Sequence, residues 1–123
     1  MKEIKFKFED LKVYQKALDF INLAYKTSEQ FPKEEAYKLT SQFIRAATSI
    51  ALNIAEGSGD TNSQFNRFLK IAIGSVRECV VCASIAKNQN YITIKEERIL
   101  RKNLEELSKM ITGLQKFLKN TNV

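Results

Sequence analysis

The sequence predicts an all-α protein: an antiparallel up-down-up-down four-helix bundle that forms a single domain over residues 1–123. The chain contains only one proline and four glycines, so there are few places where a helix can end. Apolar residues recur at spacings of three and four along most of the sequence, and no segment alternates convincingly with a period of two. These observations favour a few long helices around one core and argue against a β-sheet.

Turn signals divide the chain into four predicted helices, at about residues 10–30, 33–56, 62–87 and 94–119. Asp10 is the predicted cap of the first helix. Pro32 is expected at the start of the second, because proline is tolerated in the first turn of a helix. Gly57 is the predicted stop of the second helix, at the beginning of a Gly-Ser-Gly-Asp loop.

The third and fourth helices have clear start signals. Thr61 with Gln64 and Thr93 with Glu96 both have the spacing of a capping box, and residues 88–90 break the chain between the two helices. The fourth helix carries a heptad-like apolar seam, which is typical of an antiparallel bundle. The seam residues are Leu100, Leu104, Leu107, Ile111, Leu114 and Leu118.

The composition argues against several classes of function. With no histidine, no glycine-rich phosphate loop and no cluster of metal ligands, we expect no enzyme activity, no metal and no cofactor. Cys79 and Cys82 form a CxxC pair without a partner pair, and are expected to be buried thiols in a reducing cytoplasm. The sequence shows neither an apolar run long enough for a membrane span nor a secretory signal, so a cytoplasmic location is predicted.

The two middle helices are more apolar than a bundle of one chain requires. Between residues 39 and 55 the only formal charge is Arg45, and residues 74–86 carry only one cation and one carboxylate. A helix that is apolar nearly all round has to be buried on more than one side, which predicts a homo-oligomer. The predicted contact surface between copies consists of Ile44, Ala47, Ala51, Ala55, Val80, Val81 and Ile85.

A row of polar residues follows the second helix at intervals of three or four. It borders the apolar face, so its members can satisfy one another, for example through an ion pair of Arg45 with Glu78 or Glu56. A groove that binds a polar ligand is the alternative interpretation. The row and the motif residues beside it are Gln42, Arg45, Ser49, Asn53, Glu56, Gly57 and Glu78.

Several motifs are shared with one protein family. They are Phe8-x-x-Leu11, Phe31-Pro32, Gln42-x-x-Arg45-Ala46-x-x-Ser49-Ile50-x-x-Asn53-Ile54-Ala55-Glu56-Gly57 and Phe65-x-x-Phe68-Leu69-x-x-Ala72-x-Gly74-Ser75-x-x-Glu78. With these motifs the chain closely resembles the four-helix bundle proteins encoded by intervening sequences of bacterial 23S ribosomal RNA genes, also labelled S23 ribosomal proteins.

The resemblance implies a bacterial four-helix bundle that often assembles as a ring-like pentamer. A relative is the accessory protein of diversity-generating retroelements, a basic bundle that cooperates with a reverse transcriptase and nucleic acid. This chain departs from the usual pattern at Ile44, where a second basic residue often precedes Arg45, and at Asp60, where basic residues often follow the glycine loop. Both departures reduce the positive charge.

Two non-catalytic functions follow. The first is sequence-independent binding of RNA or DNA phosphates by basic helix faces, in line with the net charge of +6. The alternative is a protein–protein interaction scaffold for a partner such as a nucleic-acid enzyme, in which the lysines only keep the bundle in solution. The candidate nucleic-acid-binding residues are Arg67, Lys70, Arg77, Lys95, Arg98, Lys102, Lys109 and Lys116.

Overall fold

Residues 2–121, which the computed structural model describes, contain four long α-helices, two short 3₁₀ turns and no strand. This confirms the predicted all-helical fold with four helices. In chain order the elements are η1 (Lys7–Asp10), α1 (Lys12–Ser28), η2 (Lys33–Glu35), α2 (Leu39–Ser58), α3 (Asn62–Asn88) and α4 (Ile94–Thr121).

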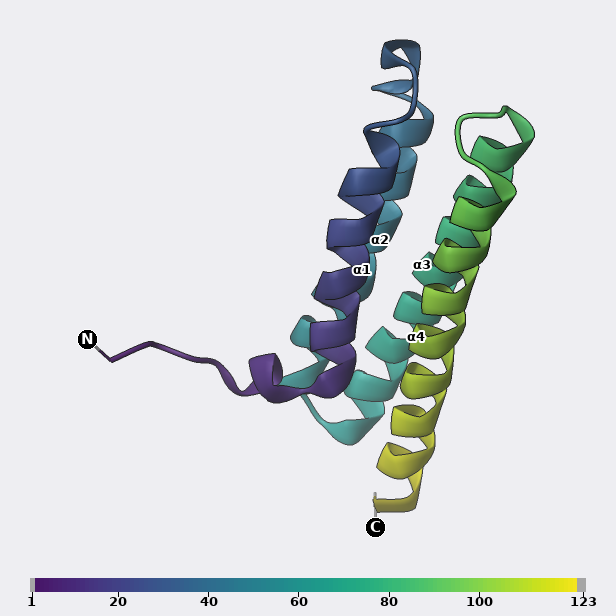
Figure 1. The fold of residues 1–123 in the computed structure, drawn as a ribbon. Coiled ribbons are helices and arrows are strands. Elements are labelled where there is room, and N and C mark those ends of the chain that lie inside the picture. The colour runs from purple at the N-terminus through teal and green to yellow at the C-terminus, as the bar shows by residue number, and fades with distance from the viewer. Residues whose placement is uncertain (1, 122–123) are drawn as a thin grey trace.

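Each long helix packs against two others, and α1 and α4 lie in front of α2 and α3 in the view of Figure 1. Two side-chain contacts set the direction of α4 relative to α1. Lys16 Nζ lies 2.8 Å from Glu106 Oε2, and Gln30 Nε2 donates to Glu96 Oε2 at 2.6 Å. Because Lys16 near the start of α1 meets the middle of α4, and Gln30 just past the end of α1 meets the start of α4, these two helices run antiparallel.

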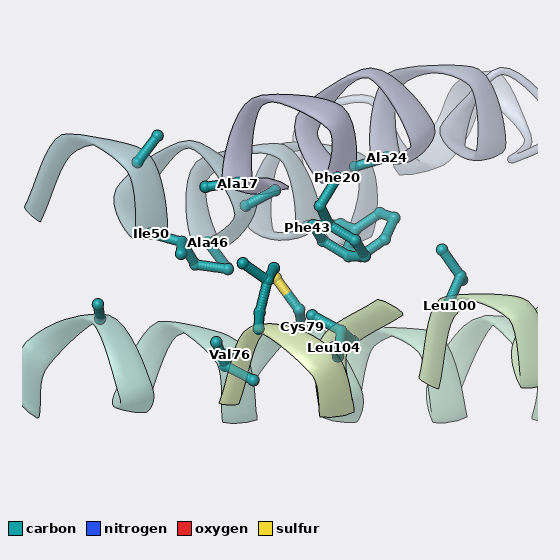
Figure 2. Packing of buried hydrophobic residues seen from close by; sticks show 14 of the residues in the cluster. Ala17, Phe20, Ala24, Phe43, Ala46, Ile50, Val76, Cys79, Leu100 and Leu104 are labelled. Atoms are coloured by element: carbon teal, nitrogen blue, oxygen red, sulfur yellow. The ribbon is translucent and has the colours of Figure 1, made fainter. Parts of the chain in front are cut away.

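The core lies where the apolar stripes of the four helices meet, and Figure 2 shows side chains from all four pointing into it. Phe43 of α2 is 1% exposed, and its ring contacts Phe20 edge-on at 6.2 Å and Phe31 at 6.1 Å between centroids. The predicted seam of α4 forms part of this core. Leu100, Leu104, Leu107, Ile111 and Leu118 are buried, and Leu114 is half-buried.

The start of α1 differs from the prediction. The helix begins at Lys12, and its N-cap residue is Leu11, which makes no side-chain cap hydrogen bond. Asp10 ends the preceding turn η1 instead, and its carboxylate forms an ion pair with Lys5 at 2.9 Å. The prediction that Asp10 caps this helix is therefore wrong, because a nearby lysine engages the carboxylate.

The second helix also begins later than predicted, at Leu39 and not at residue 33. Pro32 precedes the 3₁₀ turn η2. The turn does not continue into the helix, because the backbone of Lys38 leaves the helical region at φ −120° and ψ −105°. Glu35 then accepts a hydrogen bond from the Leu39 backbone N–H at 3.2 Å and another from the Tyr91 hydroxyl at 2.8 Å. One carboxylate thus satisfies the start of α2 and fixes the α3–α4 connection beside it.

Gly57 does not end the second helix, contrary to the prediction. The helix continues to Ser58, and Gly59 is its C-cap residue. A Cβ atom at Gly57 would lie 2.7 Å from Cβ of Phe68 and 2.8 Å from Cδ1 of Phe65. The glycine is required because α2 and α3 approach each other closely at this point, and not because the helix stops there.

We expect Gly57→Ala to lower the free energy of unfolding by about 1–3 kcal/mol, since the new methyl group overpacks against α3. The matched control is Gly59→Ala, because a Cβ at Gly59 meets no atom within 4 Å. That change should be neutral or slightly stabilising through the unfolded chain. Urea denaturation of the two variants measures the difference, and equal stabilities would contradict the close-approach explanation.

The α3–α4 connection follows the predicted signals. α3 ends at Asn88, and Asn90 adopts a left-handed conformation at φ 63°. The N–H of Tyr91 donates to the carbonyl of Ala86 at 2.9 Å, which completes a Schellman motif. Thr93 and Glu96 then form both bonds of the predicted capping box, at 2.8 and 3.0 Å.

At the start of α3 only half of the other predicted box is present. Gln64 N–H donates to Thr61 Oγ1 at 3.2 Å, as expected. The Gln64 side chain does not reach back to the Thr61 backbone, because its Oε1 accepts from Arg67 Nε at 2.9 Å.

Candidate nucleic-acid interface

A basic row runs along α4 on the side away from its buried seam. Its five members are all exposed, and they are Lys95, Arg98, Lys102, Lys109 and Lys116. Within residues 2–121 the only carboxylate that forms an ion pair with a member of the row is Glu105, 3.8 Å from Lys109 Nζ. The remaining four cations thus face solvent with their charge uncompensated by a direct contact.

Glu106, the other acidic residue in the middle of α4, forms its ion pair with a residue outside this row. Its carboxylate turns to the α1 side of the helix and contacts Lys16 at 2.8 Å. The hydrogen bond and charge of Lys16 lower the pKa of Glu106 below its usual value. Lys102 and Lys109 of the row also lower this pKa, so Glu106 borders the row while Lys16 holds its carboxylate.

A groove between α3 and α4 joins the basic row to α3. It has a volume of about 580 Å³, and Arg77, Arg101 and Lys109 lie among its lining residues. Arg101 donates from Nη2 to Ser84 Oγ at 2.7 Å and from Nε to Glu97 at 3.2 Å, which connects the two helices. The other lining residues are Val76, Val80, Leu104, Glu105 and Ser108.

The three predicted basic residues of α3 have different surroundings in the structure. Arg77 lines the groove beside α4. Lys70 is exposed two turns earlier on the same helix. Arg67 is directed elsewhere, since its guanidinium lies 5.1 Å from the Phe68 ring centroid and its Nε donates to Gln64. Arg101 was not among the predicted residues, because its pairing with Glu97 at i,i+4 in sequence gave no sign of a groove.

The polar row of α2 lies along the α2–α3 contact. Ser75 Oγ donates to Ser49 Oγ at 2.9 Å, and Asn53 Nδ2 donates to the Ser49 carbonyl at 2.8 Å. Gln42 Nε2 donates to Glu78 Oε2 at 2.9 Å. Since Ser75 precedes Glu78 whereas Ser49 follows Gln42, these contacts also show that α2 and α3 run antiparallel.

Arg45 does not form the ion pair suggested for it. Within the described residues neither Glu78 nor Glu56 lies in salt-bridge contact with Arg45, and Glu78 is bound by Gln42 instead. The guanidinium is exposed at the edge of a polar hollow of about 230 Å³, which is also lined by Gln42, Ala46, Ser49 and Glu78. Gln42, Ser49, Asn53 and Glu78 form hydrogen bonds, whereas Arg45 and Glu56 are exposed to solvent.

The predicted contact surface between copies is partly wrong. Ala47 is 0% exposed and Ala51 is 5% exposed, because the wide buried face of α2 packs against α1 as well as α3 within the same chain. Ile44, Ala55 and Val80 are half-buried. The large apolar side chains that do remain exposed on α2 and α3 are Leu52, Ile71, Val81 and Ile85, of which Leu52 and Ile71 were not predicted.

The two cysteines are both buried free thiols. Burial, with the nearby Cys82 and Glu78, raises the pKa of the Cys79 thiol well above its ordinary value. A neutral buried thiol is a poor nucleophile. Within residues 2–121 no group of three or more histidine, cysteine or acidic side chains is placed to hold a metal ion, and no helix could cross a membrane.

Comparison with known proteins identifies the family. A model of the 23S rRNA-intervening sequence protein family matches residues 9–113, which is most of the chain. The chain belongs to this family. No curated protein matches it significantly.

A solved structure shows the same fold as this member of the 23S rRNA-intervening sequence protein family. It is the crystal structure of a protein of unknown function from the S23 ribosomal protein family of Bacteroides thetaiotaomicron. The two chains superpose with a TM-score of 0.76 at 22% sequence identity, and the match covers 85% of this chain and 98% of the other. At this level of identity the similarity establishes the fold and leaves the function to be argued from the residues.

Proposed function

We propose that this family member is a non-enzymatic homo-oligomer of up-down-up-down four-helix bundles that binds the phosphate backbone of RNA or DNA without sequence specificity. The observation that carries the proposal is the spacing of the α4 lysines. Lys95, Lys102, Lys109 and Lys116 follow one another at intervals of seven residues, and all are exposed. At about 1.5 Å per residue, this places successive charges about 10 Å apart along one side of the helix.

That spacing suits a polyanion. The Debye length is about 8 Å at physiological ionic strength, so each lysine charge still contributes to the potential around its neighbours. A row of this kind attracts a nucleic-acid backbone and releases its counterions, and it makes no demand on base sequence.

The groove beside the row adds a second kind of contact. Arg77 and Arg101 come from different helices, and an arginine guanidinium can bind two phosphate oxygens at once. Arg101 is already oriented by Ser84 and Glu97, which reduces the conformational entropy that it loses on binding. The lysine row would therefore attract the backbone, and the arginines would hold a phosphate in the α3–α4 groove.

Assembly is supported by the exposed apolar residues of α2 and α3. Leu52 is 61% exposed, Val81 56%, Ile71 45% and Ile85 42%. Contact with other copies would remove these side chains from water. It would also repeat the basic face around the assembly, so that several weak phosphate contacts act together on one strand.

The same apolar residues are the basis of the alternative function, a protein-interaction scaffold. That function requires a protein partner on the α2–α3 side and makes no use of the α4 lysines. Measurement of nucleic-acid binding therefore separates the two proposals.

The test is the fluorescence anisotropy of labelled RNA and DNA strands of unrelated sequence, titrated with the protein between about 50 and 200 mM salt. We expect similar affinities for unrelated sequences, and a logarithm of the binding constant that falls with the logarithm of salt concentration with a slope of about −3 or steeper. Absence of binding at the lowest salt, or binding that is independent of salt, would contradict the nucleic-acid function and favour the scaffold. Light scattering on the same samples measures the assembly separately.

A further inference from the structure

The segment before the bundle forms an extended arm, defined here as residues 2–6. Figure 1 shows it leaving the start of α1 and pointing away from α4. Its two large apolar side chains lie in water, since Ile4 is 88% exposed and Phe6 is 62% exposed. The core of the arm's own chain therefore does not bury these two apolar side chains.

Polar contacts at the base of the arm hold it in this direction. Phe6 N–H donates to Glu9 Oε1 at 2.8 Å, and Gln15 Nε2 donates to the Glu9 carbonyl at 2.9 Å. Lys5 forms its ion pair with Asp10 at 2.9 Å. The arm is thus anchored to η1 and to the first turns of α1 by its own side chains and backbone.

Aromatic stacking strengthens the same base. The Phe6 and Phe8 rings stack with centroids 6.0 Å apart, and Phe8 packs edge-on against Tyr14 of α1 at 5.0 Å. One face of Phe8 is therefore used by its own chain, whereas most of the Phe6 surface and nearly all of Ile4 stay free.

The same chain offers an unfilled apolar groove at the end of the bundle where α1 begins and α4 finishes. It has a volume of about 290 Å³ and is lined by Leu11, Lys12, Val13, Met110 and Leu114. Phe117, one turn of α4 further on, is 60% exposed. The groove is mostly apolar, and its one charged lining residue is Lys12.

We propose that the arm of one copy docks in this α1–α4 groove of a second copy, with Ile4 and Phe6 against Met110 and Leu114. This contact rests on the homo-oligomer of the proposed function and supplies the element that joins its copies. Because the arm and the groove are different surfaces, the contact can repeat from copy to copy and close into a ring, or two copies can exchange arms about a two-fold axis.

Charge favours a second copy over nucleic acid as the partner of the arm. Residues 2–10 carry three lysines and three carboxylates, so the arm and its base have no net positive charge to attract phosphates. Within the described residues Glu3 forms no salt bridge, whereas Lys5 is paired with Asp10, so a docked arm would present Glu3 toward Lys12 at the groove. Apolar side chains flanked by a carboxylate thus match an apolar groove flanked by a lysine.

The first test is the double variant Ile4→Ser/Phe6→Ser, compared with the wild type by light scattering over a dilution series. Loss of two apolar anchors should raise the dissociation constant between copies by about 100-fold or more. Tyr37→Ser is the matched control, because Tyr37 is 97% exposed and lies far from the arm in sequence, before α2. Both variants should keep the helical circular dichroism of the folded chain.

The second test traps the contact. Ile4→Cys protein is mixed with Met110→Cys protein, and diamide is added as the oxidant. A disulfide-linked dimer of the two different variants is expected, whereas the buried native cysteines should stay reduced. The control pairs Ile4→Cys with Ile99→Cys, which is 46% exposed in the other half of α4 and should not cross-link.

The outcomes separate this inference from the proposed function. Dissociation of the double variant together with the Ile4–Met110 cross-link supports arm docking. An assembly that survives the double substitution overturns the arm inference and leaves the proposed oligomer standing. A wild-type monomer at all concentrations overturns both. If the double variant keeps its mass but loses affinity for RNA, the arm binds nucleic acid, and docking on a second copy is wrong.

Discussion

Replacement of Lys102, Lys109 and Lys116 together by glutamate is expected to weaken RNA binding by on the order of 100-fold or more at about 0.1 M salt. These residues are exposed and lie on one side of α4, where they do not contribute to the core. Each lost phosphate contact should also make the salt dependence shallower, by about one in the logarithmic slope. Fluorescence anisotropy at several salt concentrations measures both effects.

The control must change the net charge equally at another place. Lys7, Lys33 and Lys38 are exposed in η1 and around η2, and none of them lies on α4. Their replacement by glutamate gives the same total charge, and we expect a much smaller loss of affinity that reflects only the general field of the protein. If the two triple variants bind RNA equally, the α4 row is not the binding site.

Phe43→Ala should be among the most destabilising single substitutions, with a loss of about 3–5 kcal/mol in the free energy of unfolding. Its ring is 1% exposed and sits between Phe20 of α1 and Phe31, the residue before Pro32. Removal leaves a cavity among side chains that come from different helices and cannot all relax into it. Urea denaturation followed by circular dichroism measures the loss.

Tyr37→Ala serves as the comparison for Phe43→Ala. It also removes an aromatic ring, but Tyr37 is 97% exposed, so its loss should change the stability by less than about 0.5 kcal/mol. A similar loss for both variants would mean that Phe43 does not organise the core as the structure indicates.

The helical class and the buried seam of α4 could be predicted from the sequence because both follow from local periodicity. Leu100, Leu104 and Leu107 are each at most 1% exposed, as the heptad spacing indicated. Thr93 and Glu96 behaved as a capping box because their hydrogen bonds depend only on residues within one turn. Exposure of the α4 lysines follows from the same periodicity.

Features that depend on a second helix could not be predicted in this way. Gly57 has the sequence signature of a helix stop, but its role is to admit Phe65 and Phe68 of α3. Similarly, Glu35 accepts hydrogen bonds from the Leu39 backbone and from the hydroxyl of the distant Tyr91. Neither contact has a local signal in the residues themselves.

The predicted contact surface between copies, formed in part by small residues of α2, was partly wrong for the same reason. Ala47 and Ala51 lie on a second apolar side of the helix, which the sequence analysis assigned to another copy. In the structure α2 packs against both α1 and α3, and this second side lies inside the chain's own core. Periodicity shows that a helix face is buried, but it does not show which helix covers it. The arm and the α3–α4 groove were missed for the related reason that each depends on the packed arrangement.

The close approach at Gly57 also has a consequence for how the chain folds. Only residues 59–61 separate α2 from α3, and the close approach of the two helices at Gly57 lies next to this connection. Contacts between residues so near in sequence close a short loop, at little cost in chain entropy. The α2–α3 hairpin is therefore the natural nucleus of folding. α1 and α4 would add to it from either side, so the α3–α4 groove and the α1–α4 groove, both formed with α4, would be completed late.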